Sequence, residues 1–335
     1  MRLGTVALAL LHPNQAGFVK GRYITDQTKL IRMVMTYTEA TEKNGLIVSL
    51  DQEKAYNKVW HDYLWKVLEK YEFPSHFTKT VKYLYEPAKT TVMINGERSK
   101  NFHVHRGVRQ GDPLSCLIFD LAIEPLAEMI RDSNLKGYDI PGTTEHLIVN
   151  LFADNTTTFL HAEDNFEELQ RILDKWCLAS GAKFNIAKTE IIPIGEKTYH
   201  VSVTQTRKTN EHAQPLPTNL HIAMEGEAVR ILGAWYGNEI KAEQIWARNI
   251  EKVDSNLERW AKGSPSMEGR CHIIQMMIGG IIQYLTMVQG MPKSVEKRLA
   301  KCISTYLWEE KERNPVKKEV VFSNFDKGGR RVLDI

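Results

Sequence analysis

Cysteine is scarce in this sequence of 335 residues, and the cysteines present do not cluster. The four of them form no CxxC pair and lie far apart, at Cys116, Cys177, Cys271 and Cys302. Zinc modules need closely spaced cysteines, so the spacing argues against a zinc site and favours reduced thiols inside a cell. We therefore expect an intracellular protein, with nothing that distinguishes the nucleus from the cytoplasm.

Long apolar runs are also lacking. No stretch approaches the length that we expect of a membrane span, so no membrane partner is predicted. The first residues, MRLGTVALALL, resemble a short signal peptide, but no clear small-x-small cleavage site precedes His12. We predict an apolar helix there and no secretion.

A large excess of one charge is absent too, because 44 Lys and Arg stand against 41 Asp and Glu, a net charge of +3. No overall field therefore dictates a partner. Positive residues do gather in three stretches, 100–109, 293–298 and 311–318. Each is either a phosphate-facing patch or a solvated helix face or loop, and the sequence leaves both interpretations open.

Apolar residues make up 42% of the chain and recur with helix or strand spacing. Helical spacing occurs over 24–44, 59–71, 76–85, 115–131 and 166–179. Extended patterns occur over 46–50, 91–94, 102–104, 147–152, 157–160, 183–194 and 230–236, with Asn95-Gly96 as a hairpin turn between the second and the third. After residue 239 three helices are predicted, roughly 242–261, 267–289 and 294–309. The polar stretch 195–217 is predicted to be a loose insertion.

Two aspartates follow apolar strands. Asp51 comes directly after 46–50, and Asp154 lies at the turn of an apolar hairpin, LFADNTTTFL at 151–160. A single aspartate in such a place is usually a solvated turn or cap residue. Two that buried strands deliver to one point can instead hold Mg²⁺, which prefers oxygen ligands. Two metals at such a site can activate a hydroxyl and stabilise the leaving oxygen of a phosphoryl transfer.

A loop with special turn residues, RQGDPLS at 109–115, lies between these aspartates in the sequence. Gly111 permits a sharp turn, Pro113 suits the first turn of a helix, and Ser115 can cap that helix or contact a ligand. By itself the loop predicts only a loop-to-helix transition.

Six motifs, in this order, resemble those of the reverse transcriptases of non-LTR (LINE-type) retrotransposons, and they span nearly the whole chain. They are HPNQAGFVKGR (12–22), SLDQEKAYNKVW (49–60), RGVRQGDPLS (106–115), LFADN (151–155), SGAKFNIAKTE (180–190) and ILGAWYGN (231–238). They resemble, in turn, the family's fingers motif, first palm motif, Gln-Gly-x-Pro-x-Ser motif, aromatic-Ala-Asp-Asp box, Gly-x-x-x-Asn-x-x-Lys-[ST]-Glu motif and primer-grip strand. One such motif would be weak, but six in the family's order are hard to attribute to accident.

The resemblance implies an α+β fold, the right-hand polymerase, with partial fingers, a palm with an antiparallel sheet and helices, and a helical thumb. The partial fingers would cover 1–45, the palm 46–195, an insertion with the primer-grip strand 196–240, and the thumb with the start of a C-terminal connection 241–335. The implied activity is RNA-directed DNA polymerase, with an RNA template, a DNA primer, dNTPs and two Mg²⁺ ions, for which Mn²⁺ can substitute. Protein partners are not implied.

The resemblance also implies roles for single residues. Asp51 and Asp154 would bridge the metals, with Asn155 beside them and Lys188 as a proton donor to the leaving pyrophosphate. The alternative for Lys188 is a surface lysine beside Glu190.

Substrate contacts are implied in the same way. The nucleotide would meet Gln52, Tyr56, Gln110, Gly111, Pro113 and Ser115, and the primer would meet Phe152, Leu232, Gly233 and Trp235. Tyr56 would be the aromatic gate that blocks a ribose 2′-hydroxyl, or else an aromatic packed at a helix start. Phe152 has an equally simple alternative as an apolar strand residue.

Three features depart from the family. Asn155 stands where the family has Asp, and a neutral amide balances less of the charge of two metals; losing about 3 kcal/mol of stabilisation slows a reaction by roughly two orders of magnitude. Asn57 replaces an Asp at a position that we take as structural. The family's upstream fingers strands, endonuclease and zinc knuckle are not among these residues, so we expect a fragment of a decayed or mispredicted element with impaired activity.

Two alternatives remain open. The chain is either such an enzyme or a catalytically inactive, nucleic-acid-binding remnant that uses palm and thumb as a basic cradle. An RNA-dependent RNA polymerase shares the palm, but Tyr56 argues against it because ribonucleotide users need room at that position.

Overall fold

The computed structural model describes residues 2–141, 145–308 and 315–335. The chain divides into two compact units, Met1–Met224 and Glu225–Ile335. The division falls within the stretch 196–240 that the sequence analysis set between palm and thumb. Each unit is described by itself.

A five-stranded sheet in the order β11-β10-β1-β9-β8 forms the centre of the first unit. Its strands are β1 (Gly45–Leu50), β8 (Val149–Phe152), β9 (Asn155–His161), β10 (Glu190–Ile194) and β11 (His221–Ile222). β1 lies in the middle and pairs antiparallel with both β9 and β10, whereas β11 joins β10 in parallel. A central strand that is covered on both faces needs apolar side chains in both directions, which explains the run Leu46-Ile47-Val48.

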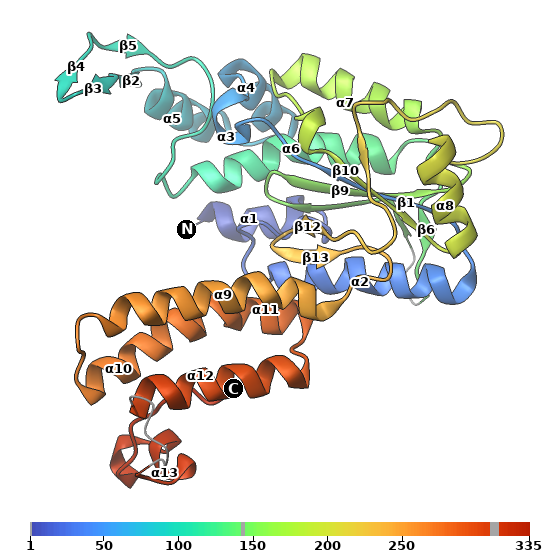
Figure 1. Ribbon diagram of the computed structural model, residues 1–335. Coiled ribbons are helices and arrows are strands. Elements are labelled where there is room, and N and C mark those ends of the chain that lie inside the picture. The colour runs from blue at the N-terminus through green and yellow to red at the C-terminus, as the bar shows by residue number, and fades with distance from the viewer. Residues whose placement is uncertain (1, 142–144, 309–314) are drawn as a thin grey trace. The chain divides into compact units, whose positions relative to one another are not determined.

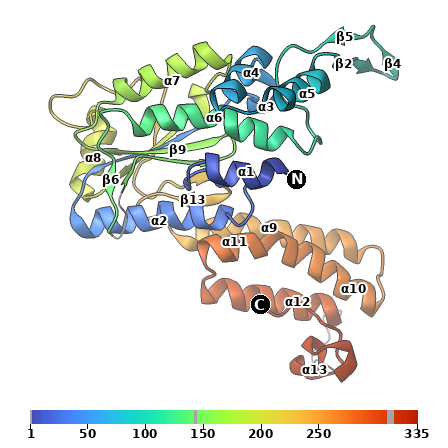
Figure 2. The ribbon, with the colours of Figure 1, turned by 180° about the vertical axis from the view of Figure 1, so that it is seen from behind.

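Helices cover both faces of this sheet. α6 and α7 lie over one face and α2 lies over the other, as both views show (Figures 1 and 2). The helices of the unit are α1 (Arg2–Leu10), α2 (Ile24–Thr41), α3 (Ala55–Lys58), α4 (His61–Lys70), α5 (Ser75–Tyr85), α6 (Ser115–Arg131), α7 (Phe166–Ser180) and α8 (Lys197–Thr206). The apolar helix predicted at the start is α1, and α6 has the bounds predicted from its apolar spacing. Val48, Leu121 and Leu173 belong to the apolar core between the sheet and α6 and α7.

Three predictions about the first unit are wrong in detail. Phe102 does not pair with 91–94: β2 (Lys89–Thr90) pairs with β5 (Phe102–His103), and β3 (Met93–Ile94) pairs with β4 (Glu97–Arg98) around the Asn95-Gly96 turn. The stretch 195–217 is not all loose, because it contains α8. The stretch 183–194 is extended only in β10, after a 3-10 turn at Ile186–Lys188. A further short pair joins β6 (Tyr138–Asp139) to β7 (His146–Leu147).

The second unit combines one hairpin with a helical bundle. The stretch predicted as a single extended segment is a hairpin of β12 (Val229–Ile231) and β13 (Ala234–Tyr236), which turns at Leu232-Gly233. The three predicted helices are α9 (Ala242–Ala261), the continuous helix made of α10 (Met267–Ile273), a π-helical turn (Ile274–Gly279) and α11 (Gly280–Gln289), and α12 (Lys293–Trp308). α13 (Lys318–Phe322) and a 3-10 turn (Phe325–Lys327) follow. Trp246, Ile278 and Leu299 are buried among the helices of this bundle.

The helix Met267–Gln289 is long and apolar enough to cross a membrane by length and composition. The prediction that no stretch approaches the length of a membrane span is therefore wrong. The buried third of its most apolar window packs in the core of the second unit.

Candidate active site

The central strand delivers Asp51 to one end of the sheet. Leu50, the last residue of β1, pairs with Thr156 of β9, so the next step along both strands is Asp51 on one and Asn155 on the other. On its other side β1 pairs Ser49 with Glu190. Asp51 therefore extends past the sheet between the β8–β9 turn and the segment that leads into β10.

The β8–β9 hairpin delivers Asp154. Phe152 pairs with Asn155, so the turn consists of Ala153 and Asp154 alone. Ala153 has a φ of 54°, in the left-handed region that favours glycine. Two-residue turns with a positive φ match the twist of a hairpin, which is why the chain accepts this conformation.

The two aspartates lie close enough to affect one another. Burial and then the negative charge of Asp51 raise the pKa of Asp154, and a hydrogen bond from the Tyr56 hydroxyl opposes the rise. Tyr56 is held from the other side, because its ring centroid lies 4.6 Å from that of Phe119 on α6. Burial and the charge of Asp154 in turn raise the pKa of Tyr56. The two interpretations of Tyr56 are therefore not exclusive, since it is packed and also touches the acidic site.

Lys188 points to the same place. Its Nζ lies 3.5 Å from Asp51 Oδ2, and the Asn185 N–H donates to the Asp51 carbonyl at 2.7 Å. Glu190 pairs with His221 instead. Lys188 is thus a surface lysine, but its ion pair is with Asp51 and not with Glu190.

A divalent cation fits this pair of carboxylates. Asp51 and Asp154 place two negative charges together, and a cation between them would relieve the repulsion that raises the pKa of Asp154. Within the described ranges no three or more His, Cys, Asp or Glu side chains are grouped to hold a metal. Mg²⁺ needs only one or two protein carboxylates when water and substrate phosphates complete its shell.

The predicted nucleotide-binding residues lie in two places. Gln52 is buried next to the aspartates, and its Nε2 donates to the Asp154 carbonyl at 3.3 Å. Gln110 and Gly111 are exposed in the loop before α6, where Gly111 has a φ of 88°. Pro113 is exposed in the same loop. These three residues are available to a ligand.

Ser115 is not exposed in this way. Its side chain is buried, and its Oγ lies 2.9 Å from the Tyr85 hydroxyl. α6 begins after Leu114 without a side-chain cap, so Ser115 is neither the predicted cap nor open to a nucleotide. Its small size fits the tight packing at the start of α6.

The predicted primer residues are divided between the units. Phe152 is half-buried at the end of β8, beside the Ala153–Asp154 turn. Leu232, Gly233 and Trp235 belong to the β12–β13 hairpin of the second unit. That hairpin is fixed to α11, because Gln289 Oε1 accepts from the Trp235 N–H at 3.0 Å and Gln289 Nε2 donates to the Trp235 carbonyl at 2.8 Å.

The basic stretches differ in their setting. Residues 100–109 are mostly exposed and lead into the Gln110–Gly111 loop, and 293–298 form the first turns of α12. Of the stretch 311–318, residues 311–314 lie outside the described residues.

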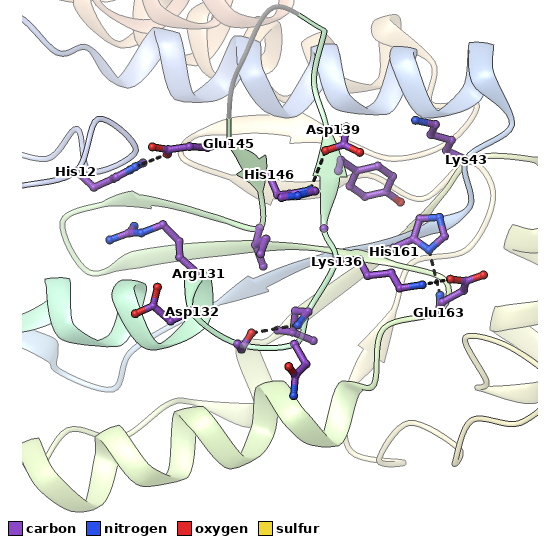
Figure 3. Close-up of a pocket in the computed structure, with 16 residues that line it drawn as sticks. His12, Lys43, Arg131, Asp132, Lys136, Asp139, Glu145, His146, His161 and Glu163 are labelled. Carbon is purple, nitrogen blue, oxygen red and sulfur yellow. Dashed lines mark hydrogen bonds and ion pairs between the residues drawn. The ribbon is translucent and has the colours of Figure 1, made fainter.

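A pocket of about 870 Å³ lies at the other end of β9, where His161 lines it (Figure 3). Acidic and basic side chains pair with one another around it, as His12–Glu145, His146–Asp139 and Lys136–Glu163. The pocket is thus separate from the Asp51–Asp154 pair, and these side chains already have partners.

Sequence reasoning missed two polar residues that lie against the site. Asp120 on α6 is fully buried, and burial, followed by the charges of Glu124 and Asp154, raises its pKa far above the usual range. The signal was a carboxylate inside the apolar run LIFDLAIE. Gln15 contacts Ala153 from 138 residues away, and although it lies in the fingers motif, no residue of that motif had been given a role.

Comparison with known proteins agrees with the motifs. The family model described as reverse transcriptase (RNA-dependent DNA polymerase) matches residues 1–234. The uncharacterized 149 kDa protein of transposon TX1 from Xenopus laevis is 28% identical over 312 residues, which is 92% of this chain and 23% of that protein. The Pol polyprotein of the type-2 retrotransposable element R2DM from Drosophila melanogaster is 29% identical over 163 residues, 49% of this chain and 15% of that protein. The chain thus spans about a quarter or less of the length of these relatives.

Among solved structures, the match to apo telomerase from Candida tropicalis covers 92% of this chain and 53% of that chain, at 11% identity and a TM-score of 0.46. The match to telomerase from Candida albicans in complex with a TWJ fragment of telomeric RNA covers 93% of this chain and 54% of that chain, at 12% identity and a TM-score of 0.46.

Proposed function

Because this chain belongs to the reverse transcriptase (RNA-dependent DNA polymerase) family, we propose that it catalyses DNA synthesis on an RNA template within a larger retrotransposon protein. The family match and the transposon relatives confirm the resemblance found in its six motifs. One observation supports the activity most directly: neighbouring antiparallel strands bring Asp51 and Asp154 to the same end of the sheet.

These two carboxylates are the groups that would hold two Mg²⁺ or Mn²⁺ ions, and the Gln52 carbonyl would be a third oxygen ligand. When bound, the ions lower the barrier to attack of a primer 3′-hydroxyl and stabilise the leaving pyrophosphate. The chain's own part is to fix the carboxylates, which β1 and the β8–β9 turn do from two strands of one sheet.

Lys188 is the proton donor that we propose for the leaving pyrophosphate. Its ammonium lies next to Asp51, and its side chain is 68% exposed, so it is free to turn toward a phosphate. A positioned general acid contributes typically 10²- to 10⁴-fold to a rate.

Tyr56 is the group that would select dNTPs over rNTPs. Its ring packs on Phe119 and its hydroxyl is held by Asp154, so the ring has little freedom to move aside for a 2′-hydroxyl. Such a gate selects by steric exclusion and does not need a new hydrogen bond to the sugar.

In the first unit Phe152 would contact the primer. In the second unit the β12–β13 hairpin, with Leu232, Gly233 and Trp235, would contact the primer. Basic residues of the second unit would contact the duplex backbone, which binds without reading sequence and weakens steeply with salt.

Asn155 is the residue that limits the proposal. Its exposed side chain lies at the start of β9, directly after Asp154, and brings an amide where a carboxylate would add charge to the metal site. We therefore propose impaired activity, and the second candidate function is an inactive nucleic-acid-binding remnant.

A primer-extension assay separates the two. The protein is given an RNA template, a labelled DNA primer, dNTPs and Mg²⁺ or Mn²⁺, next to Asp51→Asn and Asp154→Asn variants. Slow extension that both substitutions abolish supports the polymerase. Salt-sensitive binding of primer–template with no extension, even after Asn155→Asp, supports the remnant, and preference for rNTPs would contradict the role of Tyr56.

A further inference from the structure

A short segment before α2 is joined to the edge of the β8–β9 hairpin. The Leu151 N–H donates to the Asn14 carbonyl at 2.9 Å, and the Ala16 N–H donates to the Leu151 carbonyl at 3.0 Å. Gln15 thereby forms a parallel bridge with Leu151 of β8. The segment covers the outer edge of β8, where backbone groups would otherwise remain unpaired.

The side chain of Gln15 extends this contact to the turn itself. Gln15 is fully buried, and its Oε1 accepts from two backbone groups, the Gly17 N–H at 2.9 Å and the Ala153 N–H at 3.0 Å. Because both partners are donors, the amide can face them only with its oxygen. Its Nε2 has no hydrogen-bond partner among the described residues. Burying an amide nitrogen without a hydrogen-bond partner costs free energy. An apolar side chain would avoid this cost, but it could not accept the two hydrogen bonds that Oε1 accepts.

Ala153 is the residue that needs such support. It holds a positive φ of 54°, and for a residue with a side chain this region costs on the order of 1–2 kcal/mol. Gly17 lies directly against it, since a Cβ at Gly17 would come within 2.3 Å of the Ala153 nitrogen. The segment 14–17 thus packs without a gap on the residue that precedes Asp154.

We propose that Gln15 is a positioning residue: it fixes the Ala153 backbone and thereby the direction in which Asp154 is presented to the metal site. The second half of this statement rests on the proposed polymerase function, whereas the first half does not. Gln15 touches neither metal nor substrate, and acts only through the turn.

The test uses the full chain labelled with [¹⁵N]alanine, in which the Ala153 signal is identified by its loss in Ala153→Gly. Gln15→Met keeps the length of the side chain and removes the acceptor, and it should speed hydrogen exchange of the Ala153 amide about tenfold, as the net contribution of one hydrogen bond implies. Gln15→Glu keeps an acceptor oxygen and should restore most of the protection. Asn14→Ala is the matched control, because it removes the bond from Asn14 Nδ2 to the Val149 carbonyl (3.1 Å) in the same segment without touching Ala153.

Mn²⁺ binding, measured by electron paramagnetic resonance, reports on Asp154. Gln15→Met should weaken Mn²⁺ binding by about tenfold, which is the lower end of the loss in metal affinity when a residue that supports a metal ligand is removed. Asn14→Ala should leave Mn²⁺ binding unchanged. Unchanged Ala153 exchange in a folded Gln15→Met protein would overturn the proposal. Faster exchange with unchanged Mn²⁺ affinity overturns the link to Asp154. If Asp154→Asn also leaves Mn²⁺ binding unchanged, the metal site of the proposed function fails instead.

Discussion

Lys188 and Asp51 form an ion pair across the end of the sheet, with 3.5 Å between Nζ and Oδ2. The lysine comes from the turn before β10, and the aspartate follows β1, the strand with which β10 pairs. The proposed proton donor is thus held next to a carboxylate proposed to bind metal, so it would need no large movement to reach a phosphate there.

Lys188→Ala should therefore reduce activity far more than stability. Both partners are well exposed, at 68% and 40% of their side chains, so we expect the free energy of unfolding to change by less than about 1 kcal/mol. Loss of a general acid should slow nucleotide incorporation by roughly a hundredfold or more. Single-turnover extension in the Asn155→Asp background measures the rate, and urea unfolding measures the stability.

Lys183→Ala is the matched control, because the Lys183 Nζ lies 3.8 Å from Glu53 Oε2 instead and the Lys183 side chain is 70% exposed. Equal slowing by both substitutions would mean that the positive charge of the segment matters and not a proton from Lys188.

Asn155→Asp should increase the rate of extension. The side chain is exposed at the start of β9, so the added charge has little desolvation cost, and the residue directly follows Asp154 and comes next to Asp51 in the register of β1 and β9. A gain of about 3 kcal/mol in transition-state stabilisation corresponds to roughly a hundredfold. Extension rates with Mg²⁺ check this.

Asn155→Ala removes the amide without adding charge and should be no faster than the unchanged protein. If Asn155→Asp is no faster than Asn155→Ala, the missing carboxylate is not what limits the activity.

The residues that the sequence located correctly are those whose signal is local. The apolar run of β1 and the continuous apolar spacing of α6 predicted both elements. The apolar strands β1 and β8 also pointed to Asp51 and Asp154, which follow them. α8 was missed because Lys197–Thr206 is rich in Thr and Val, whose branched side chains favour helices little. Asn95-Gly96 predicted a turn, but the turn determines only the pairing of the two strands next to it, β3 and β4. Phe102 was therefore paired with 91–94, whereas it belongs to β5, which pairs with β2.

Contacts between distant parts of the chain have no such signal. The support of Ala153 by Gln15 joins residues 138 apart, and the hydrogen bond between Tyr56 and Asp154 depends on how α3 meets the hairpin. Motif resemblance identified the segments, but only packing shows which of their side chains meet.

Asp120→Asn should stabilise the protein, and more so as the pH rises. Burial raises the pKa of Asp120, so the folded chain keeps this proton while the unfolded chain releases it above its ordinary pKa of about 3.9. Stability due to the protonated carboxyl is therefore full below about pH 4 and falls as the pH rises toward the folded pKa. The neutral asparagine avoids that loss.

The midpoint of thermal unfolding, measured from pH 3 to pH 8, tests this. The two proteins should agree near pH 3 and separate above pH 4, and each 1 kcal/mol is worth about 2–4 °C in a unit of this size. Asp132→Asn changes an exposed aspartate just after the same helix and should give no such pH-dependent gain. A constant difference at every pH would show that the effect is packing and not the proton.

Gln289→Met should loosen the β12–β13 hairpin and weaken primer binding. Gln289 pairs with both backbone groups of Trp235, and the Tyr284 hydroxyl donates to the Leu232 carbonyl at 2.5 Å, so α11 holds the turn at two points. Losing two of these bonds should raise the dissociation constant of an RNA–DNA primer–template by roughly tenfold or more, since each contributes about 0.5–1.5 kcal/mol. Fluorescence anisotropy at fixed salt measures the affinity.

Gln283→Met alters an exposed glutamine of the same helix and should bind as the unchanged protein does. Equal affinity for both variants, with Gln289→Met still folded, would mean that the hairpin does not carry the primer contact.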